Sequence, residues 1–388
     1  MPKRLHSIDM LRGLVIVIMA LDHVRDMLGH SAVRPADFSE ADGLLFFTRW
    51  VTHLCAPTFV VLAGVSAYLY GAKGRSKVEL SRFLLTRGLW LIVVELTLVG
   101  FGWNFNISAQ YAPFLQVIWV LGVSMIILAG LIWLPLSVIA GLSIAMLLAH
   151  NLLDDIQPAS EKASAIWRLL HIGGLLSIAD TPIIYVSYPL VPWPGVMALG
   201  YVLGAYFVGD QAHRSRNLIV AGALMMLAFG LLRYINAYGD ANLWQAQGHS
   251  VATVIDFFNT TKYPPSLHYL LMTLGPAALL LGLFERITAK RGLMSIARNA
   301  LATIGRVPFF FYVVHLYVIH AAALLLGIFQ GIPIAQTAVV FAFYPEQFGV
   351  GLAMVYFFWV CVVLAFYPAC RWFAGVKARR KDWWLSYL

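Results

Sequence analysis

Arg12 and His23 are the residues whose types and spacing first point to chemistry. They lie eleven positions apart in the apolar stretch 7–30, whose centre, 14–21, holds only apolar residues. Eleven steps of 100° place both side chains on one helix face, about 16 Å apart along the axis. Charged side chains inside a membrane are costly and usually face a polar interior where they have a task. We therefore predict one wall of a cavity, with a cation toward one membrane surface and an imidazole toward the other.

His23 is the candidate general base. A neutral imidazole takes a proton from an amine or a hydroxyl, and Asp22 or Asp26 would orient the ring or stabilise its protonated form. Arg25 lies three residues after Asp22, within reach on a helix. The alternative is that Asp22, Arg25 and Asp26 only neutralise one another near the outer membrane surface. That alternative leaves the shared face of Arg12 and His23 unexplained.

Two further histidines fall at a similar depth in predicted membrane helices. His53 lies in RWVTHLCAPTFVVLAG, where Pro57 would kink the helix, and His315 lies in GRVPFFFYVVHLYVIH. Each is either a second catalytic residue or a packing residue. Clustered histidines also suit a metal, but no HxxxH or HxxE pair shares a helix face, so we predict no metal site.

Basic residues gather at the predicted cytoplasmic ends of the helices. Arg82, Arg87 and Arg306 would lie there beside Arg12. They suit the phosphates of a nucleotide-bearing donor, so all four are candidate donor-binding residues. The positive-inside rule alone would also place them there.

The outer ends of the helices hold other charged residues. Lys262 and Tyr263, in KYPPS, are candidates for docking a polar acceptor together with Arg25. An interfacial lysine beside a helix cap is the alternative for Lys262. Glu95 and Arg233 lie in apolar segments, where they either pair with each other or line the cavity.

Signatures of several other enzyme classes do not occur in the sequence. It holds no GK[ST] phosphate loop, no GxSxG nucleophile elbow and no CxxC pair, so ATPase, serine hydrolase and thiol-redox functions lose their usual support. The three cysteines lie in apolar segments and suggest neither disulfides nor a metal motif.

Membrane helices must position these residues. Of the 388 residues, 61% are hydrophobic and only 12% are charged, and the mean hydropathy is +0.78. Soluble domains carry about 25% charged residues. The apolar runs are about twenty residues long, as helices that span a membrane require, and not the shorter alternating runs of a barrel. The sequence predicts an all-α, polytopic integral membrane protein with a single domain over residues 1–388.

The topology follows from the apolar runs and the positive charges. We predict ten spans, near 10–29, 50–71, 82–101, 114–133, 136–150, 193–209, 217–237, 265–284, 301–326 and 349–370. With the N-terminus inside, 20 of the 27 Lys and Arg residues are cytoplasmic, which predicts that both termini are cytoplasmic. The long segments 30–49, 151–192, 238–264 and 327–348 then lie outside, with an interfacial helix expected over 163–172. No cleavable signal peptide is predicted.

Several blocks of the sequence resemble known membrane acyltransferases. Arg12, ten intervening residues and His23 are similar to the R-X10-H motif of the acyltransferase-3 enzymes. The bacterial relatives of heparan-alpha-glucosaminide N-acetyltransferase are a closer resemblance. It rests on five blocks of sequence: SIDMLRG, MALDHVRDML, FTRWVTHLCAPTFVVLAG, TKYPPSLHYLLMTLG and IGRVPFFFYVVHLYVIH. Both groups belong to the transmembrane acyltransferase superfamily. The resemblance covers most of the chain except 151–192 and 327–348.

The resemblance implies a function and roles for residues. Such enzymes move an acyl group, usually acetyl from cytosolic acetyl-CoA, to a glycan or another acceptor across the membrane. The motif assigns the catalytic role to His23 and a donor-binding or structural role to Arg12, with His53 and His315 on the cavity walls. In heparan-alpha-glucosaminide N-acetyltransferase itself, a lysosomal enzyme, the catalytic histidine lies beyond the first span. That position would favour His30 or His53 in this chain. Its large luminal domain has no counterpart here, so heparan sulfate is not implied.

The resemblance therefore implies an acyl-CoA-dependent acyltransferase, which we expect in a bacterial inner membrane. The expected partners are acyl-CoA, a sugar or glycan-type acceptor, membrane lipids and a second copy in a homodimer, but no nucleic acid. His23 would activate the acceptor for direct attack, or would itself carry the acyl group. The alternative is a secondary transporter or flippase with a polar midplane site, which predicts inverted repeats that the sequence does not display.

Overall fold

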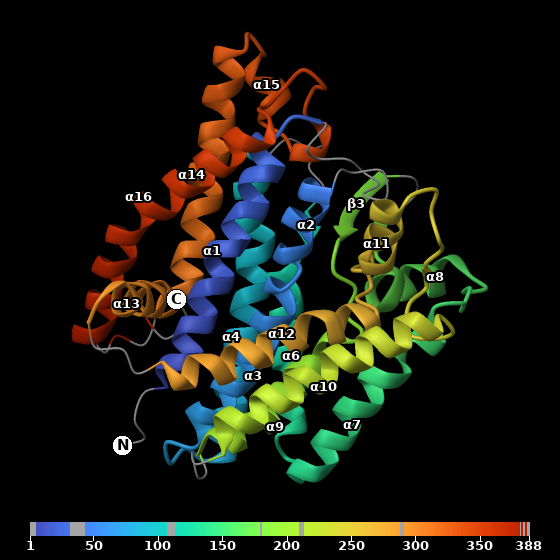
Figure 1. The fold of residues 1–388 in the computed structure, drawn as a ribbon, viewed down its shortest axis with the longest axis vertical. Helices are drawn as coiled ribbons and strands as arrows, with labels where there is room; N and C mark the ends of the chain where they lie inside the picture. The colour runs from blue at the N-terminus through green and yellow to red at the C-terminus, as the bar shows by residue number, and fades with distance from the viewer. Residues whose placement is uncertain are drawn as a thin grey trace.

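A bundle of long helices surrounds the first one, α1, in the computed structural model (Figure 1). The structure describes residues 5–31, 43–106, 113–178, 181–208, 213–287, 291–380, 382 and 385. The bundle consists of α1 (His6–Leu28), α2 (Gly43–Thr52), α3 (Cys55–Gly71), α4 (Lys77–Val94), the π-helix η2 (Glu95–Val99), α5 (Gly100–Asn104), α6 (Val117–Leu131), α7 (Leu136–Ala149), α9 (Trp193–Val208), α10 (Arg214–Ile235), α12 (Leu267–Arg286), α13 (Leu293–Gly305), α14 (Pro308–Phe329) and α16 (Leu352–Arg379).

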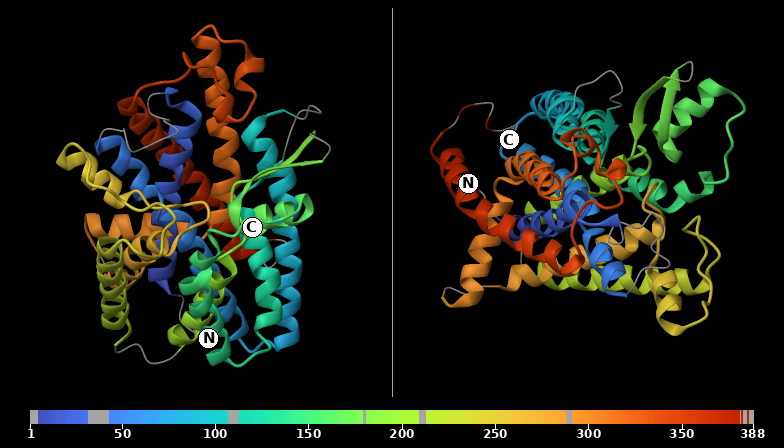
Figure 2. Two further views of the ribbon diagram at one scale, coloured as in Figure 1. Left: turned by 90° about the vertical axis from the view of Figure 1, so that its right-hand side faces the viewer. Right: turned by 90° about the horizontal axis from the view of Figure 1, so that it is seen from above.

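Short elements lie at the edges of this bundle. They are β1 (Phe114–Leu115), η3 (His150–Leu153), α8 (Glu161–Trp167), η4 (Arg168–Ile172), β2 (Gly174–Ile178), β3 (Thr181–Val186), α11 (Ser250–Phe258), α15 (Ile334–Thr337) and η5 (Phe341–Phe343). The three strands form a small sheet in the order β1-β3-β2, which stands beside the helices with α8 (Figure 2). β3 is antiparallel to β2 and parallel to β1. The sequence analysis expected helices alone, so these strands are an addition to it.

The protein is helical and membrane-spanning, as the sequence predicts. Each of the ten predicted spans overlaps a helix, and seven helical segments are long and apolar enough to cross a membrane: Gly43–Gly71, Lys77–Asn104, Leu136–Leu153, Arg214–Ile235, Leu267–Arg286, Pro308–Phe329 and Leu352–Arg379. Among the remaining three, α6 and α9 are shorter, with 15 and 16 residues, and α1 carries several charges. The count of ten and the cytoplasmic termini therefore stay predictions.

Some predicted boundaries differ from the structure. The predicted ninth span, 301–326, begins too early: α13 ends at Gly305, and a new helix, α14, starts with Pro308 in its first turn, where proline is favoured. The predicted second span is divided at His53 and Leu54 into α2 and α3. The interfacial helix predicted over 163–172 corresponds to α8 and η4.

Parts of the predicted topology fall outside the described residues. Most of the predicted outer loop 30–49 does so, because the structure leaves out residues 32–42. Five basic residues of the charge count also lie outside the described part, namely Lys3, Arg4, Arg34, Lys290 and Lys381.

α1 is held in the middle of the bundle, between α14 and α16 on one side and α2 and α3 on the other (Figure 1). α16 runs antiparallel to it, since Gly29 at the end of α1 bridges to Val350 before the start of α16. The Trp359 indole N–H of α16 also donates to the Val17 carbonyl at 2.7 Å. Most side chains of α1 are buried. Because other helices pack around α1, only a limited part of its surface can border a cavity.

Two glycines let α1 and α13 cross in backbone contact. A Cβ built on Gly13 would lie 1.9 Å from the Leu301 carbonyl oxygen, and one on Gly305 would lie 1.8 Å from the Asp9 carbonyl oxygen. Small residues at helix crossings allow this close packing in membranes. The crossing lies directly beside Arg12 and therefore controls where that side chain sits.

The Gly13→Ala substitution is expected to destabilise the protein by about 1–3 kcal/mol, because the new methyl group forces the two backbones apart. The measurement is the thermal unfolding midpoint of the detergent-solubilised protein. Gly141→Ala in α7 is the matched control, because a Cβ there meets no atom within 4 Å among the described residues. Equal midpoints for the two variants would contradict the tight crossing.

Candidate functional site

Two adjoining cavities run along α1 from Arg12 to His23. The larger, of about 300 Å³, is bordered on α1 by Arg12, Ile16 and Met19. The smaller, of about 60 Å³, is bordered on α1 by Met19, Asp22 and His23. The two cavities share four lining residues: Met19, Phe59, Val117 and Tyr312. The structure thus places Arg12 and His23 along one continuous wall.

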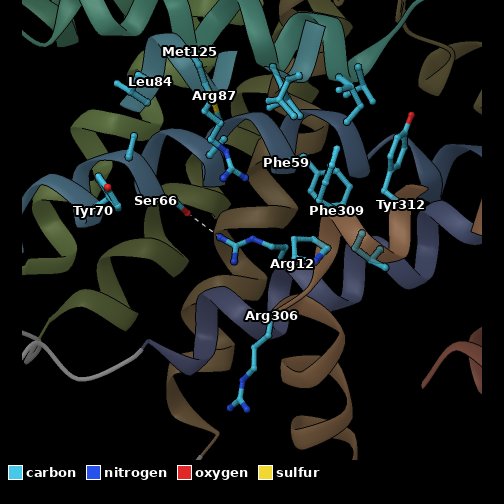
Figure 3. A pocket seen from close by; sticks show the side chains of 18 of the residues that line it. Arg12, Phe59, Ser66, Tyr70, Leu84, Arg87, Met125, Arg306, Phe309 and Tyr312 are labelled. Carbon is cyan, nitrogen blue, oxygen red and sulfur yellow. Dashed lines mark hydrogen bonds between the residues drawn. The ribbon is translucent and has the colours of Figure 1, made fainter. Parts of the chain in front are cut away.

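The end of the larger cavity away from His23 is basic. Arg12 of α1, Arg87 of α4, Lys377 of α16 and Arg306, which follows α13, all line this cavity. In Figure 3 the Arg12 and Arg87 side chains lie together on one side of the view and the Tyr312 ring on the other. The cavity therefore changes from cationic to aromatic along its length.

Arg12 is held by two neighbouring helices, α3 and α13, and by Asp9 of its own helix. Its Nη2 donates to the Ser66 hydroxyl of α3 at 2.9 Å, and its Nη1 donates to the Gly305 carbonyl of α13 at 3.3 Å. Asp9 lies 3.5 Å from Arg12 and 3.9 Å from Arg306. One buried carboxylate thus holds two cations at the basic end, and Arg12 both fixes the helices and faces the cavity.

The wall between the two ends is apolar. It is built by side chains of α1, α3, α4, α6 and α14, among them Ile16, Phe59, Leu91, Leu121 and Phe309. Glu95 positions α6 in this wall: its carboxylate accepts the Trp119 backbone N–H at 2.7 Å in the first turn of that helix. A carboxylate at a helix N-terminus is favourable. Glu95 therefore caps α6 and does not pair with Arg233, which donates to carbonyls at the end of α11.

His23 and His315 form a hydrogen-bonded pair. His23 Nδ1 lies 2.7 Å from His315 Nε2, and the ring planes are within 13° of each other. His315 Nδ1 lies 2.9 Å from the Phe311 carbonyl oxygen, which can only accept, so this nitrogen carries a hydrogen. In a neutral imidazole the other nitrogen is then an acceptor. His23 Nδ1 must therefore donate to His315.

This network leaves the lone pair of His23 on Nε2. No hydrogen-bond partner for that nitrogen occurs among the residues that the structure describes. His23 borders the smaller cavity, so an unprotonated ring nitrogen is available where a second molecule can enter. The arrangement suits proton abstraction from a bound hydroxyl or amine.

The smaller cavity is lined by polar side chains from several elements. Besides Asp22 and His23 they are Thr52, Gln116, Tyr188, Lys262 and Tyr269. Burial disfavours the Lys262 ammonium, but the Tyr263 phenol and the Asp22 carboxylate outweigh burial and raise the pKa of Lys262. Lys262 is therefore a cation at neutral pH, opposite a carboxylate in the same cavity.

Arg25 holds the two aspartates of α1. Its Nη2 lies 2.9 Å from Asp22 Oδ1 and 2.6 Å from Asp26 Oδ1. Asp22, Arg25 and Asp26 therefore form the ion pairs that the sequence analysis gave as an alternative. Asp22 nevertheless borders the cavity, whereas Asp26 and Arg25 do not appear among its lining residues in the described part of the chain.

Other candidate residues lie behind or away from the cavities. His53 is buried at the break between α2 and α3, with its ring 5.4 Å from that of Tyr269. Thr52 and Cys55 on either side of it line the smaller cavity, but His53 itself does not among the described residues. His30 follows α1, where its Nδ1 lies 3.3 Å from the Ser31 hydroxyl.

The remaining predicted binding residues divide by exposure. Arg82 is exposed on α4 and is not among the described lining residues of the larger cavity, in contrast to Arg87. Tyr263 is 41% exposed and packs its ring 5.0 Å from that of Tyr188, a lining residue of the smaller cavity. Within the described ranges no three His, Cys, Asp or Glu side chains gather as metal ligands do.

Two lining residues, Lys377 and Tyr312, are not among the candidates that the sequence offers. Lys377 enters only the cytoplasmic charge count, because nothing in the sequence brings the last helix next to Arg12. Tyr312 lies three residues before His315, and this spacing puts both on one helix face. The i,i+3 relation to a candidate histidine is therefore a signal by which Tyr312 can be found.

Comparison with known protein families gives a match over the first part of the chain. Residues 4–234, more than half of the chain, match the family model described as heparan-alpha-glucosaminide N-acetyltransferase, catalytic. This range contains Arg12, His23 and Arg87, and ends near the end of α10. No curated protein matches the chain.

Proposed function

The chain belongs to the family of the heparan-alpha-glucosaminide N-acetyltransferase catalytic domain, and from this premise we propose that it transfers an acetyl group from acetyl-CoA to a sugar-type acceptor. The acceptor group is an amine or a hydroxyl, and His23 is its general base. The donor enters from the cytoplasm, and the acceptor enters from the outer side of a bacterial inner membrane.

The observation that carries this proposal is the free lone pair of His23 beside the smaller cavity, which adjoins the larger one. The chain of hydrogen bonds from Phe311 through His315 to His23 leaves Nε2 as the unprotonated nitrogen. A general base contributes about 10²–10⁴ to a rate when it is held within hydrogen-bond reach of the proton it takes. The family supports acetyl transfer as the reaction, and this geometry supports His23 as the base.

The larger cavity matches the chemistry of a CoA donor along its length. Arg12, Arg87, Arg306 and Lys377 would hold phosphate groups, which guanidinium and ammonium groups bind through charge-assisted hydrogen bonds. The apolar middle would hold the pantetheine arm. The distance of about 16 Å along α1 from Arg12 to His23 is of the order of that arm.

The smaller cavity limits what reaches the base. It measures about 60 Å³, while a single water molecule needs about 10–15 Å³ of such space. The reacting amino or hydroxyl group and the acetyl methyl fit together in this space, and the remainder of a sugar ring would extend beyond it. Asp22 and Lys262 supply one acceptor and one donor of hydrogen bonds, which suits a polyhydroxylated molecule.

In the proposed reaction His23 Nε2 takes the proton of the acceptor as its nitrogen or oxygen attacks the thioester carbon. The carbon–sulfur bond then breaks, and the imidazolium returns the proton to the departing CoA sulfur. The products are the acetylated acceptor and CoA with a free thiol. His23 ends the cycle neutral, so no further reactant is required.

A thiol-release assay tests the proposal. Purified protein is incubated with acetyl-CoA and a panel of amino sugars and neutral sugars, and the free thiol of CoA is followed with a chromogenic disulfide. Mass spectrometry identifies the acetylated acceptor. We expect acceptor-dependent thiol release. Absence of release with every acceptor, together with substrate flux through proteoliposomes, would replace the enzyme by the transporter or flippase alternative.

The Arg87→Ala substitution is expected to raise the KM for acetyl-CoA about tenfold or more and to leave kcat within about threefold. A hydrogen bond to a charged group contributes about 1.5–3 kcal/mol, and 1.4 kcal/mol is a factor of ten in affinity. Loss of binding that is equal in the ground and transition states raises KM alone.

Arg82→Ala is the matched control for Arg87, because Arg82 lies on the same helix but is exposed outside the cavity. Its KM should equal that of the wild type. With acetyl-pantetheine, which lacks the nucleotide, Arg87→Ala should no longer differ from the wild type. A KM defect in Arg82→Ala but not in Arg87→Ala would place the nucleotide elsewhere.

A further inference from the structure

The surroundings of His23 contain two polar groups that the proposed reaction has not yet used. The Trp103 ring lies 5.0 Å from the His23 ring and the Tyr312 ring lies 6.1 Å from it, both in edge-to-face orientation. Both side chains are only 4% exposed. Within the described structure, neither the Trp103 Nε1–H nor the Tyr312 hydroxyl has a hydrogen-bond partner.

Unpartnered buried donors are rare because losing water without gaining a partner is costly. The Trp103 indole N–H lies close to the Tyr312 hydroxyl oxygen, outside the usual hydrogen-bond geometry. An indole N–H can only donate, so Trp103 offers no acceptor for the Tyr312 hydroxyl hydrogen. Tyr312 also lies near Glu95, whose Oε2 accepts the Trp119 backbone N–H and whose Oε1 makes no hydrogen bond within the described structure, to Tyr312 or to any other residue. The Tyr312 hydroxyl is therefore a donor whose partner is missing from the described part of the chain.

The two unpartnered donors differ in their access to the cavities. Tyr312 lines both the larger and the smaller cavity, so its side chain stands where the two meet. Trp103 is absent from the described lining of both and packs against His23 from behind. A molecule that reaches from the basic end to His23 must therefore pass Tyr312.

We propose that the Tyr312 hydroxyl is a catalytic residue that donates a hydrogen bond to the thioester carbonyl oxygen as this oxygen becomes negatively charged. The inference rests on the proposed acetyl transfer. It adds to that function a residue that stabilises the transition state, opposite the residue that removes the proton. In a dry, low-dielectric cavity a preorganised donor of this kind is worth more than in water.

The complete step requires only the two substrates, His23 and Tyr312. The acceptor amine or hydroxyl attacks the carbonyl carbon, and its proton passes to His23 Nε2. The carbonyl oxygen takes the electron pair of its π bond and accepts the hydrogen bond from Tyr312, which keeps its own proton. The oxyanion then re-forms the carbonyl and expels the CoA sulfur, which receives the proton from His23.

Tyr312→Phe tests this role because it removes only the hydroxyl oxygen and keeps the ring. We expect kcat to fall about 10²–10³-fold, as for the loss of one oxyanion donor, and the KM for acetyl-CoA to stay within about twofold. The unfolding midpoint should stay the same or rise, because an unpartnered buried hydroxyl no longer has to be desolvated.

Tyr317→Phe is the matched control on the same helix. Its hydroxyl donates to the Leu98 carbonyl at 2.7 Å, and it is not a lining residue of either cavity in the described structure. Tyr317→Phe should show the opposite pattern, with a lower unfolding midpoint and an unchanged kcat.

Three outcomes are distinguishable. A large loss of kcat at an unchanged or raised midpoint in Tyr312→Phe supports the inference. A kcat within about threefold of the wild type, or a loss of kcat that goes together with a lowered midpoint, overturns it while the wild-type activity still supports acetyl transfer. Wild-type protein that releases no CoA thiol with any acceptor overturns the proposed function, and the inference with it.

Discussion

The His23→Gln variant is expected to bind acetyl-CoA with unchanged affinity and to transfer the acetyl group at least about 10³-fold more slowly than the wild type. Gln is chosen because its amide N–H can still donate to His315, so the local packing and the hydrogen bond are kept. What it lacks is a nitrogen that takes a proton. General base catalysis contributes about 10²–10⁴ to a rate, and the loss of the base is expected in the upper part of this range because no other imidazole lines the cavity in the described structure.

The measurement for His23→Gln separates binding from chemistry. Binding of acetyl-CoA is followed by calorimetry or by thermal stabilisation, and transfer is followed by single-turnover thiol release. His6→Gln serves as the control because His6 is exposed at the start of the same helix. Wild-type rates in His23→Gln would move the role of base to His53 or His30.

The same variant addresses the acyl-histidine alternative. Wild-type protein mixed with radiolabelled acetyl-CoA and no acceptor is quenched, and the label on the protein is counted. Direct transfer predicts no label on the wild type. A label that is present on the wild type and lost in His23→Gln would instead show that His23 carries the acetyl group.

Helix periodicity predicts the central feature of this site. The spacing of Arg12 and His23 depends only on the residues per turn of one helix, so the sequence was sufficient to place both on one wall. The depth of His315 follows in the same way from its position within its helix. What one helix cannot supply is the contact between His23 and His315, because this depends on how α1 and α14 pack.

Tertiary packing also explains what the sequence does not predict. Lys377 reaches the basic end because α16 runs antiparallel to α1, and Arg82 stays outside because it and Arg87 occupy different faces of α4. His53 lies at the break between α2 and α3, and its neighbours Thr52 and Cys55 line the cavity in its place. The position of a residue along one helix can be predicted from the sequence of that segment. The direction in which its side chain points at a helix break cannot.

Asp22 occupies both of the positions that the sequence offers for it. The sequence offers either an ion pair with Arg25 or a place beside the base. The structure has the ion pair at 2.9 Å and also places Asp22 on the wall of the smaller cavity, across from the cationic Lys262. The ion pair fixes the carboxylate, and a fixed carboxylate is what an acceptor with several hydroxyl groups would need for orientation.

His315→Leu is the second substitution with a large expected effect, and here the role is positioning. His315 has no place among the described residues that line the cavities, so we expect it to act through His23. Leucine offers no acceptor for the His23 Nδ1–H. The ring is then free to adopt the other tautomer, in which Nε2 carries the hydrogen and cannot take a proton. We expect kcat to fall about 10²–10⁴-fold with KM for acetyl-CoA unchanged, by analogy with the loss of the tautomer-fixing carboxylate in a catalytic triad.

His315→Gln separates positioning from simple packing. The Gln side-chain oxygen can accept the His23 Nδ1–H and restore the productive tautomer, although it cannot titrate. We therefore expect His315→Gln to recover at least about tenfold of the activity that His315→Leu loses, even if both have the same unfolding midpoint. Equal kcat in the two variants would mean that the 2.7 Å contact does not determine which nitrogen of His23 is free. If the loss of kcat instead follows the unfolding midpoint in the two variants, His315 has only a packing role. Packing alone does not require a hydrogen-bond acceptor at this position, whereas fixing the tautomer of His23 does.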